Sequence, residues 1–227
     1  MIKTLPILLA VGYGLVMYRF SVWRTGRELD EQSTVLADPK LVAMSNQMAK
    51  ALDLPRINVH IYEIEPVNGL AAPDGRIFIT RGFYNKFCAG EVTAEELASV
   101  IAHELGHVAL GHSRRRMIDF SGQNAMRAAL GMVLSRFIPG VGVWIANMLT
   151  SLLAAKLSRS DEFEADAYAA ALLTKAGIGI APQISLFEKL DALTKSGGGR
   201  APAWLMTHPK TEERIAALNK MQVKWER

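Results

Sequence analysis

Two histidines and a glutamate in VIAHELGHVALGH, residues 100–112, have the spacing of a metal site. His103 and His107 are four residues apart, so on an α-helix they differ by about 40° around the axis and can reach one ion. Glu104 lies about 100° from His103 on such a helix. Its carboxylate stays out of the coordination sphere but close enough to take a proton from water held there. The pattern predicts a hydrolytic zinc site on a helix.

A catalytic zinc site needs a third protein ligand and one position for water. The segment SRSDEFEADAYAAALL, residues 158–173, carries Glu162 and Asp166 four residues apart on one predicted helix face. One carboxylate can bind the metal while the other holds the outer nitrogen of a ligand histidine. Glu164 lies about 200° from Glu162 and is expected to point elsewhere. Without the HELGH segment, these acids would only complement a helix dipole.

His112 is the nearest further histidine, but it lies about 180° from His103 unless the helix ends and turns back first. The extended pattern HExxHxxGxxH also fails, because Leu110 and Ser113 stand where it needs glycine and histidine. We therefore interpret His112 as a helix-end cap or a surface residue.

The elements that position these residues follow from periodicity and end signals. Residues 38–54 start with an N-cap aspartate and a proline and predict an amphipathic helix. Alternation over residues 57–63 and the apolar run 76–80 predict strands of a small sheet. Thr93 and Glu96 form a capping box that starts the helix carrying HELGH. The expectation is a mainly helical α+β fold with the HExxH motif on a central helix.

Composition bounds the class of protein. The chain of 227 residues is 50% hydrophobic and 21% charged, with a formal net charge of +4, which predicts one globular body with a core. The small net charge, with one basic run at residues 114–116, argues against nucleic-acid binding. Cys88 is the single cysteine, so any metal must use histidines and carboxylates. The sequence carries no signal for an oligomeric state.

The N-terminal segment predicts a membrane anchor. Residues 5–18 carry no charge and lie between Lys3 and Arg19, which can reach the interface. No small-x-small site follows, so an uncleaved single-pass anchor is favoured over a signal peptide or a surface helix. Residues 1–27 are then anchor and flank, and residues 28–227 the metallopeptidase domain. The arginines after the segment favour the cytoplasmic side of an inner membrane over the periplasmic side.

A second apolar stretch runs through nineteen uncharged residues, 137–155. Its length permits a span. Pro139, Gly140 and Gly142 near its start instead favour a turn between two helices, and so a buried or membrane-surface helical hairpin.

Four separated features, at residues 67–82, 98–112, 158–166 and 207–215, occur in the order found in a known family. Over roughly residues 38–220 the chain resembles the membrane-associated zinc metallopeptidases that include HtpX-type proteases and the CAAX prenyl protease. The resemblance implies a zincin-like fold and one zinc ion per chain.

The resemblance also assigns residues. It implies that Glu162 is the third zinc ligand and that Asp166 supports a ligand. His208 and Arg214 match the late HP motif and the arginine near it. His208 is then either a catalytic group that stabilises the oxyanion or a gate in the open zinc position, whereas the bare sequence would make it an exposed loop residue.

We also expect a substrate-binding edge. Strand residues Ile77, Phe78 and Ile79 are predicted to pair with an extended peptide, with Asn68 close by. Recognition of backbone suits unfolded or misassembled protein substrates, and hence a metalloendopeptidase of membrane protein quality control. The alternative is a membrane-bound chaperone or scaffold with a structural zinc site, against which the base Glu104 argues.

Overall fold

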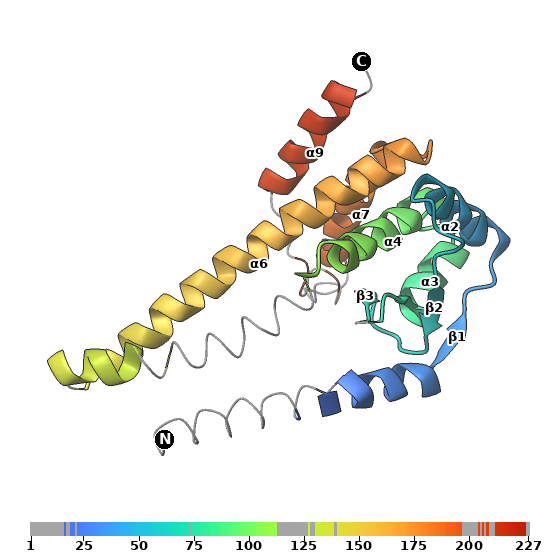
Figure 1. Ribbon diagram of the computed structural model, residues 1–227. Coiled ribbons are helices and arrows are strands. Elements are labelled where there is room, and N and C mark those ends of the chain that lie inside the picture. The colour runs from blue at the N-terminus through green and yellow to red at the C-terminus, as the bar shows by residue number, and fades with distance from the viewer. Residues whose placement is uncertain are drawn as a thin grey trace. The chain divides into compact units, whose positions relative to one another are not determined.

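A computed structural model gives the fold of the chain (Figure 1). It describes residues 22–72, 74–112, 130–138, 140–196 and 212–225, with Val16, Arg19, Phe20, Arg127, Trp204, Met206 and His208. The chain divides into two compact units, one of Met1–Gln32 with Arg114–Lys156 and one of Ser33–Ser113 with Leu157–Arg227. Most of the expected anchor, residues 1–27, lies outside the described residues.

The second unit contains a small sheet. Its strands are β1 (Ser33–Val35), β2 (Val59–Tyr62), β3 (Gly69–Ala71) and β4 (Ile77–Thr80), in the order β1-β2-β4-β3. β2 pairs in parallel with β4, and the other pairs are antiparallel. The two strands expected from alternation are confirmed as β2 and β4. The others are three residues long, too short to show a period, and sequence analysis missed them.

The sheet order overturns one expectation about substrate. β4 is an inner strand, because β2 occupies one of its edges and β3 the other. Ile77, Phe78 and Ile79 are also no more than 1% exposed. The prediction that these three residues bind substrate is wrong, since their backbone groups pair within the sheet and their side chains belong to the core. The edge strands are β1 and β3.

The helices follow their end signals. Their bounds are α2 Pro39–Ala51, α3 Arg81–Cys88, α4 Ala94–Ala109, α6 Gly142–Lys175, α7 Ala181–Ser196 and α9 Glu212–Trp225. Asp38 caps α2 by accepting from the backbone N–H groups of Lys40 and Leu41. Thr93 and Glu96 cap α4 reciprocally, as predicted. The mainly helical α+β expectation is confirmed.

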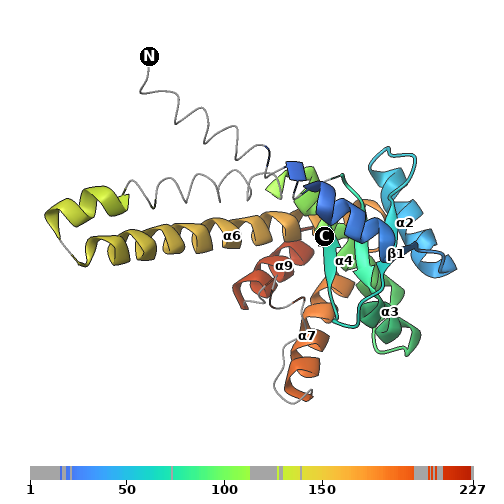
Figure 2. The same ribbon diagram turned by 90° about the horizontal axis from the view of Figure 1, so that it is seen from below.

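Helix α4 is the centre of this unit (Figure 2). It contacts α2, α7 and strands β3 and β4. Every residue from Ala94 to His107 except Glu95 is buried. Its apolar side chains join one core with residues of the sheet, α6 and α7, among them Leu173 and Phe187. The HExxH motif therefore lies on a central helix whose position is held from several sides.

In the first unit, residues 130–137 are helical and a turn leads into α6. Gly140 has φ +84°, which favours glycine, and a Cβ on Gly142 would lie 2.3 Å from the Ser135 backbone nitrogen. The expected turn between two helices is thus present. Among the helices that the structure describes, none is both long and apolar enough to cross a membrane.

Candidate zinc site

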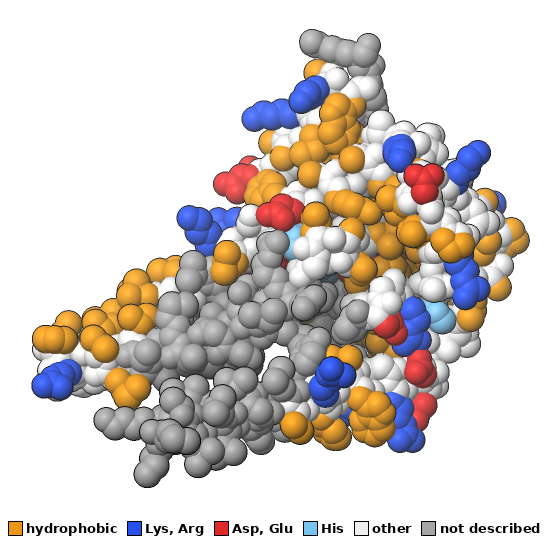
Figure 3. Space-filling view, in the orientation of Figure 1, with side chains coloured by type: hydrophobic (Ala, Val, Ile, Leu, Met, Phe, Trp, Pro, Cys, Tyr) orange, Lys and Arg blue, Asp and Glu red, His pale blue; other side chains and the backbone are white. Residues whose placement is uncertain are grey.

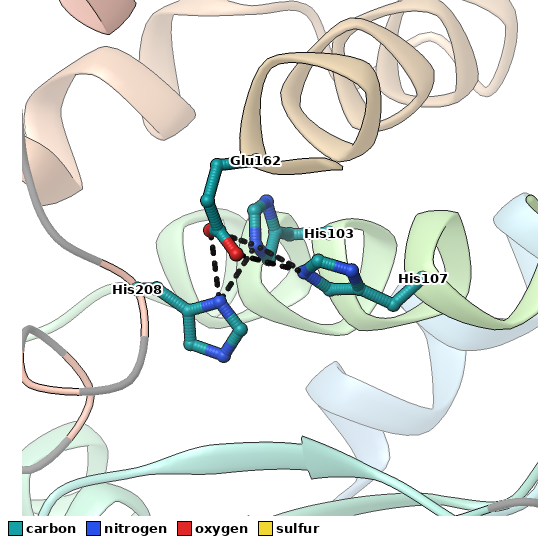
Figure 4. A group of neighbouring side chains, drawn as sticks. All are labelled: His103, His107, Glu162 and His208. Atoms are coloured by element: carbon teal, nitrogen blue, oxygen red, sulfur yellow. Dashed lines mark hydrogen bonds and ion pairs between the residues drawn. The ribbon is translucent and has the colours of Figure 1, made fainter. Parts of the chain in front are cut away.

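The histidines of HELGH turn one ring nitrogen each toward a common point (Figure 4). His103 and His107 are 2% and 4% exposed, and their Nε2 atoms lie 3.2 Å apart. They share a face because they are one helical turn apart on α4.

Glu162 reaches this point from α6. Its Oε2 lies 3.4 Å from His103 Nε2, and its Oε1 lies 3.5 Å from His107 Nε2. His208 completes a group of four, with Nδ1 at 3.3 Å from His103 Nε2 and 2.9 Å from Glu162 Oε2. All four residues are buried, and one potential ligand atom of each lies within 4.8 Å of the others.

The donor set fits zinc. Ligands at 2.0–2.1 Å in a tetrahedron are about 3.3 Å from one another. The distances among His103, His107 and Glu162 are 3.2, 3.4 and 3.5 Å. Imidazole and carboxylate are both ligands that zinc accepts. The group can therefore hold this ion with little movement.

Asp166 lies behind His103. Its Oδ1 is 2.9 Å from His103 Nδ1, and it accepts two hydrogen bonds from the Arg214 guanidinium, at 2.6 and 2.8 Å. Burial raises the pKa of Asp166, but the bonds from Arg214 and His103 outweigh it and the pKa is lowered. For His103 burial acts in the opposite direction and lowers the pKa, but the hydrogen bonds to Asp166 and Glu162 raise this pKa to about 9. The carboxylates of Asp166 and Glu162 therefore favour positive charge next to them.

The pKa of Glu162 is also displaced. Burial acts to raise it, but hydrogen bonds with His103 and His208 hold it far below its usual range. A carboxylate that stays ionised in a buried group of imidazoles is available as a metal ligand.

Glu104 lies beside the group of ligand residues, close to His208. It is 2% exposed, and among the residues that the structure describes its buried Oε1 has no hydrogen-bond partner. The nearest described cation-forming group is His208 Nε2, 3.3 Å from that oxygen. A Cβ on Gly69 would lie 3.5 Å from the same atom, so the edge strand β3 passes close to it. Glu104 is therefore placed between the ligand group and a strand edge.

His208 is not an exposed loop residue, since it is 6% exposed. Its backbone N–H donates to the Trp204 carbonyl, and the backbone N–H of Trp204 donates to the Val67 carbonyl next to the sheet. The Trp204 ring lies 5.8 Å from the His103 ring and 5.4 Å from that of His208, between centroids. Sequence analysis missed Trp204, which no spacing rule connects to the histidines.

His112 is neither a helix-end cap nor a surface residue, as its exposure is 0%. Its Nδ1 lies 2.9 Å from His107 Nδ1, and its Nε2 lies 3.3 Å from Glu164 Oε2. The chain turns back because α4 ends at Ala109 and Gly111 adopts φ +69°. In the sequence, Gly111 could have indicated that the helix ends before His112. Glu164, which was expected to point away from Glu162, contacts His112 and is not one of the four converging residues.

Asn68, expected near the substrate, stays a prediction. It precedes β3, its backbone N–H donates to Thr80 Oγ1 at 2.9 Å, and its side-chain oxygen accepts from the Gly69 N–H at 3.0 Å. These bonds fix the start of the edge strand beside Glu104.

Comparisons with known proteins agree with this geometry. Peptidase family M48 matches residues 36–222. Metalloprotease LoiP of Escherichia coli (strain K12) is 30% identical over 197 residues, which cover 83% of this chain and 73% of that protein. Metalloprotease YcaL of the same organism is 29% identical over 181 residues, covering 77% and 66%. A protease HtpX homolog of Chlorobium phaeobacteroides (strain BS1) is 26% identical over 249 residues, covering 92% and 79%. The chain therefore belongs to peptidase family M48 and is a zinc-dependent metallopeptidase.

Proposed function

We propose that the chain is a membrane-associated endopeptidase in which Glu104 is the general base and acid. Support comes from its buried Oε1, which has no hydrogen bond and lies beside the ligand group. A buried oxygen in this state costs stability unless something at the site uses it. This observation carries the proposal.

Three residues are assigned to hold the zinc ion, His103, His107 and Glu162. When bound, zinc polarises a peptide carbonyl and lowers the pKa of a water molecule. Glu104 would take a proton from the water whose oxygen adds to the peptide carbonyl, and would deliver that proton to the amine nitrogen as the C–N bond breaks. Asp166 and Arg214 keep the His103 ring oriented through the bonds at its outer nitrogen.

We assign His208 the role of a gate in this conformation. Its Nδ1 occupies a position close to the ligand atoms of His103 and Glu162, and its Nε2 faces Glu104. Water and a substrate carbonyl need that position. We therefore propose that His208 withdraws before a peptide bond is cut, and its burial against the Trp204 ring supports this assignment.

The edge of β3 is the proposed substrate site in place of β4. β3 pairs with β4 on one side only, and Gly69 brings its backbone close to Glu104. An extended peptide can add there as a further strand, which reads backbone more than side chains. Unfolded or misassembled proteins expose such segments, so we infer a role in protein quality control.

Membrane attachment is assigned to the N-terminal segment at the inner membrane, with the catalytic unit on the cytoplasmic side. The apolar run at residues 5–18 and the arginines after it support this. Figure 3 shows hydrophobic side chains gathered along one end of α6. Trp144 and Leu152 on α6 and Phe137 in the preceding helical segment are exposed. Removal of residues 1–27 should shift the protein from vesicles to the soluble fraction. Persistent binding would instead assign the attachment to the hairpin.

Purified protein tests the activity directly. We expect about one zinc ion per chain and cleavage of unfolded casein that a chelator stops and added zinc restores. Zinc bound tightly with no cleavage of any unfolded substrate would favour the alternative, a chaperone or scaffold that uses zinc for stability.

A further inference from the structure

The two histidine ligands on α4 each have a partner at the ring nitrogen that faces away from the ligand group. His103 Nδ1 lies 2.9 Å from Asp166 Oδ1, and His107 Nδ1 lies 2.9 Å from His112 Nδ1. A metal-ligating histidine almost always donates its outer N–H to a fixed acceptor, which sets its tautomer and ring orientation. His112 thus holds, for His107, the place that Asp166 holds for His103.

The other ring nitrogen of His112 indicates where its proton is. His112 Nε2 lies 3.3 Å from Glu164 Oε2 and 3.8 Å from Asp161 Oδ1. An ionised carboxylate only accepts, so Nε2 donates, and a neutral ring then offers Nδ1 as an acceptor. His107 has its Nε2 turned to the ligand group, which leaves the proton on its Nδ1. The two Nδ1 atoms match as donor and acceptor.

The turn after α4 brings His112 into contact with His107. His112 is fully buried, and the chain reaches it through Gly111 at a positive φ. Its ring meets that of His107 at 5.0 Å between centroids and an interplanar angle of 70°. This edge-on approach directs nitrogen to nitrogen. His112 is not one of the four residues whose ligand atoms converge.

We propose that His112 is a positioning residue for the zinc ligand His107. It accepts the Nδ1–H of His107 and continues the hydrogen-bond chain to Glu164. The inference rests on the zinc site proposed above. It gives His107 an imidazole, that of His112, as the partner of its outer nitrogen, whereas His103 has the carboxylate of Asp166.

Two substitutions separate this role from simple packing. His112→Leu fills the space but accepts nothing, and it should weaken zinc binding about 10- to 100-fold, the usual loss for such a partner. His112→Asn places an amide oxygen near the position of Nδ1, and it should keep zinc affinity within about threefold because it still accepts from His107. Zinc affinity is measured by chelator competition on the full chain. Leu110→Ala, at an exposed neighbour on the same helix end, is the matched control.

The outcomes separate the two proposals. If the natural protein binds zinc and His112→Leu binds it as tightly, the positioning role is refuted and the zinc site stands. Equal losses in the Asn and Leu variants would also refute it, because packing alone would then explain them. If the natural protein takes up no zinc, the site itself is refuted.

A spectrum of the natural protein decides the matter even if a variant fails to fold. In zinc-loaded protein with ¹⁵N-histidine, we expect His112 to carry its proton on Nε2 and to show an unprotonated, hydrogen-bonded Nδ1. Their loss in whichever of the two His112 variants folds assigns these signals to His112. A proton on His112 Nδ1 would overturn the proposal.

Discussion

Helix α4 holds two buried glutamates with opposite environments. Glu96, in its first turn, accepts from the Thr93 N–H at 2.8 Å, from Ser185 Oγ at 2.6 Å and from Lys189 Nζ at 2.8 Å. Glu104, two turns later, has an Oε1 with no hydrogen bond. Both residues are 2% exposed. The same side chain at the same burial is fully satisfied at one position and left unsatisfied at the other.

The difference separates structure from chemistry. Burial raises the pKa of Glu96, but the bonds from Lys189, Ser185 and Thr93 outweigh it, and the pKa is lowered. That carboxylate ties α4 to α7 and has no lone pair directed at a ligand group. The Oε1 of Glu104 makes no such hydrogen bond between described elements, so this oxygen remains able to exchange a proton. Removal of Glu96 should therefore cost stability, and removal of Glu104 should cost activity.

The largest effect is expected from loss of the carboxylate in the ligand group that Glu104 lies beside. Glu162→Ala should remove zinc and abolish cleavage, because only two of the three assigned ligands, His103 and His107, would remain. Glu164→Ala on the same helix is the comparison, and it should lose far less zinc because its carboxylate contacts His112 and not the ligand group. Zinc content and casein cleavage are measured on the same preparations. Equal zinc loss in both variants would contradict the ligand assignment.

Glu104→Gln should lower kcat by about 10³-fold, within the range for loss of a general base. Zinc content should not change, since Glu104 is outside the ligand group. The melting temperature should stay within a few degrees, because no hydrogen bond at Oε1 is lost. Glu95→Gln, at the exposed glutamate of the same helix, serves as control. Full activity in Glu104→Gln would end the mechanism proposed here.

His208→Ala should raise the activity several-fold at constant zinc content, because it opens the position that His208 Nδ1 holds near the ligands. Steady-state kinetics decides the sign. A fall in kcat of about a hundredfold with KM unchanged would instead show that His208 stabilises the oxyanion, the role left open by the sequence. Unchanged constants would dismiss both roles.

Sequence predicted best what local spacing determines. The capping box of Thr93 and Glu96 and the i, i+4 pairs on α4 and α6 follow from helix geometry. Sequence analysis failed where the structure depends on which strands pair with one another. The strand order that buries β4 cannot be read from residues 76–80, because an inner strand and an edge strand can both be apolar. The expectation that His112 lies on the surface is wrong because it assumes an ideal helix as far as residue 112, whereas α4 ends at Ala109 and the chain turns at Gly111.

The smallest effect on activity, and the largest on stability, is expected from Glu96→Gln. The amide loses the ion pair with Lys189 in a buried position, so at pH 7 unfolding should cost roughly 1–3 kcal/mol less, with kcat within about twofold. The folded pKa of Glu96 is lowered, so its contribution is present above the unfolded value of about 4.3 and is lost as pH falls through the folded value. Urea unfolding at pH 7 and at lower pH should therefore show the natural protein losing its advantage over Glu96→Gln in acid. Parallel pH profiles would mean that Glu96 does not act through its charge, and the contrast with Glu104 would then rest on hydrogen bonding alone.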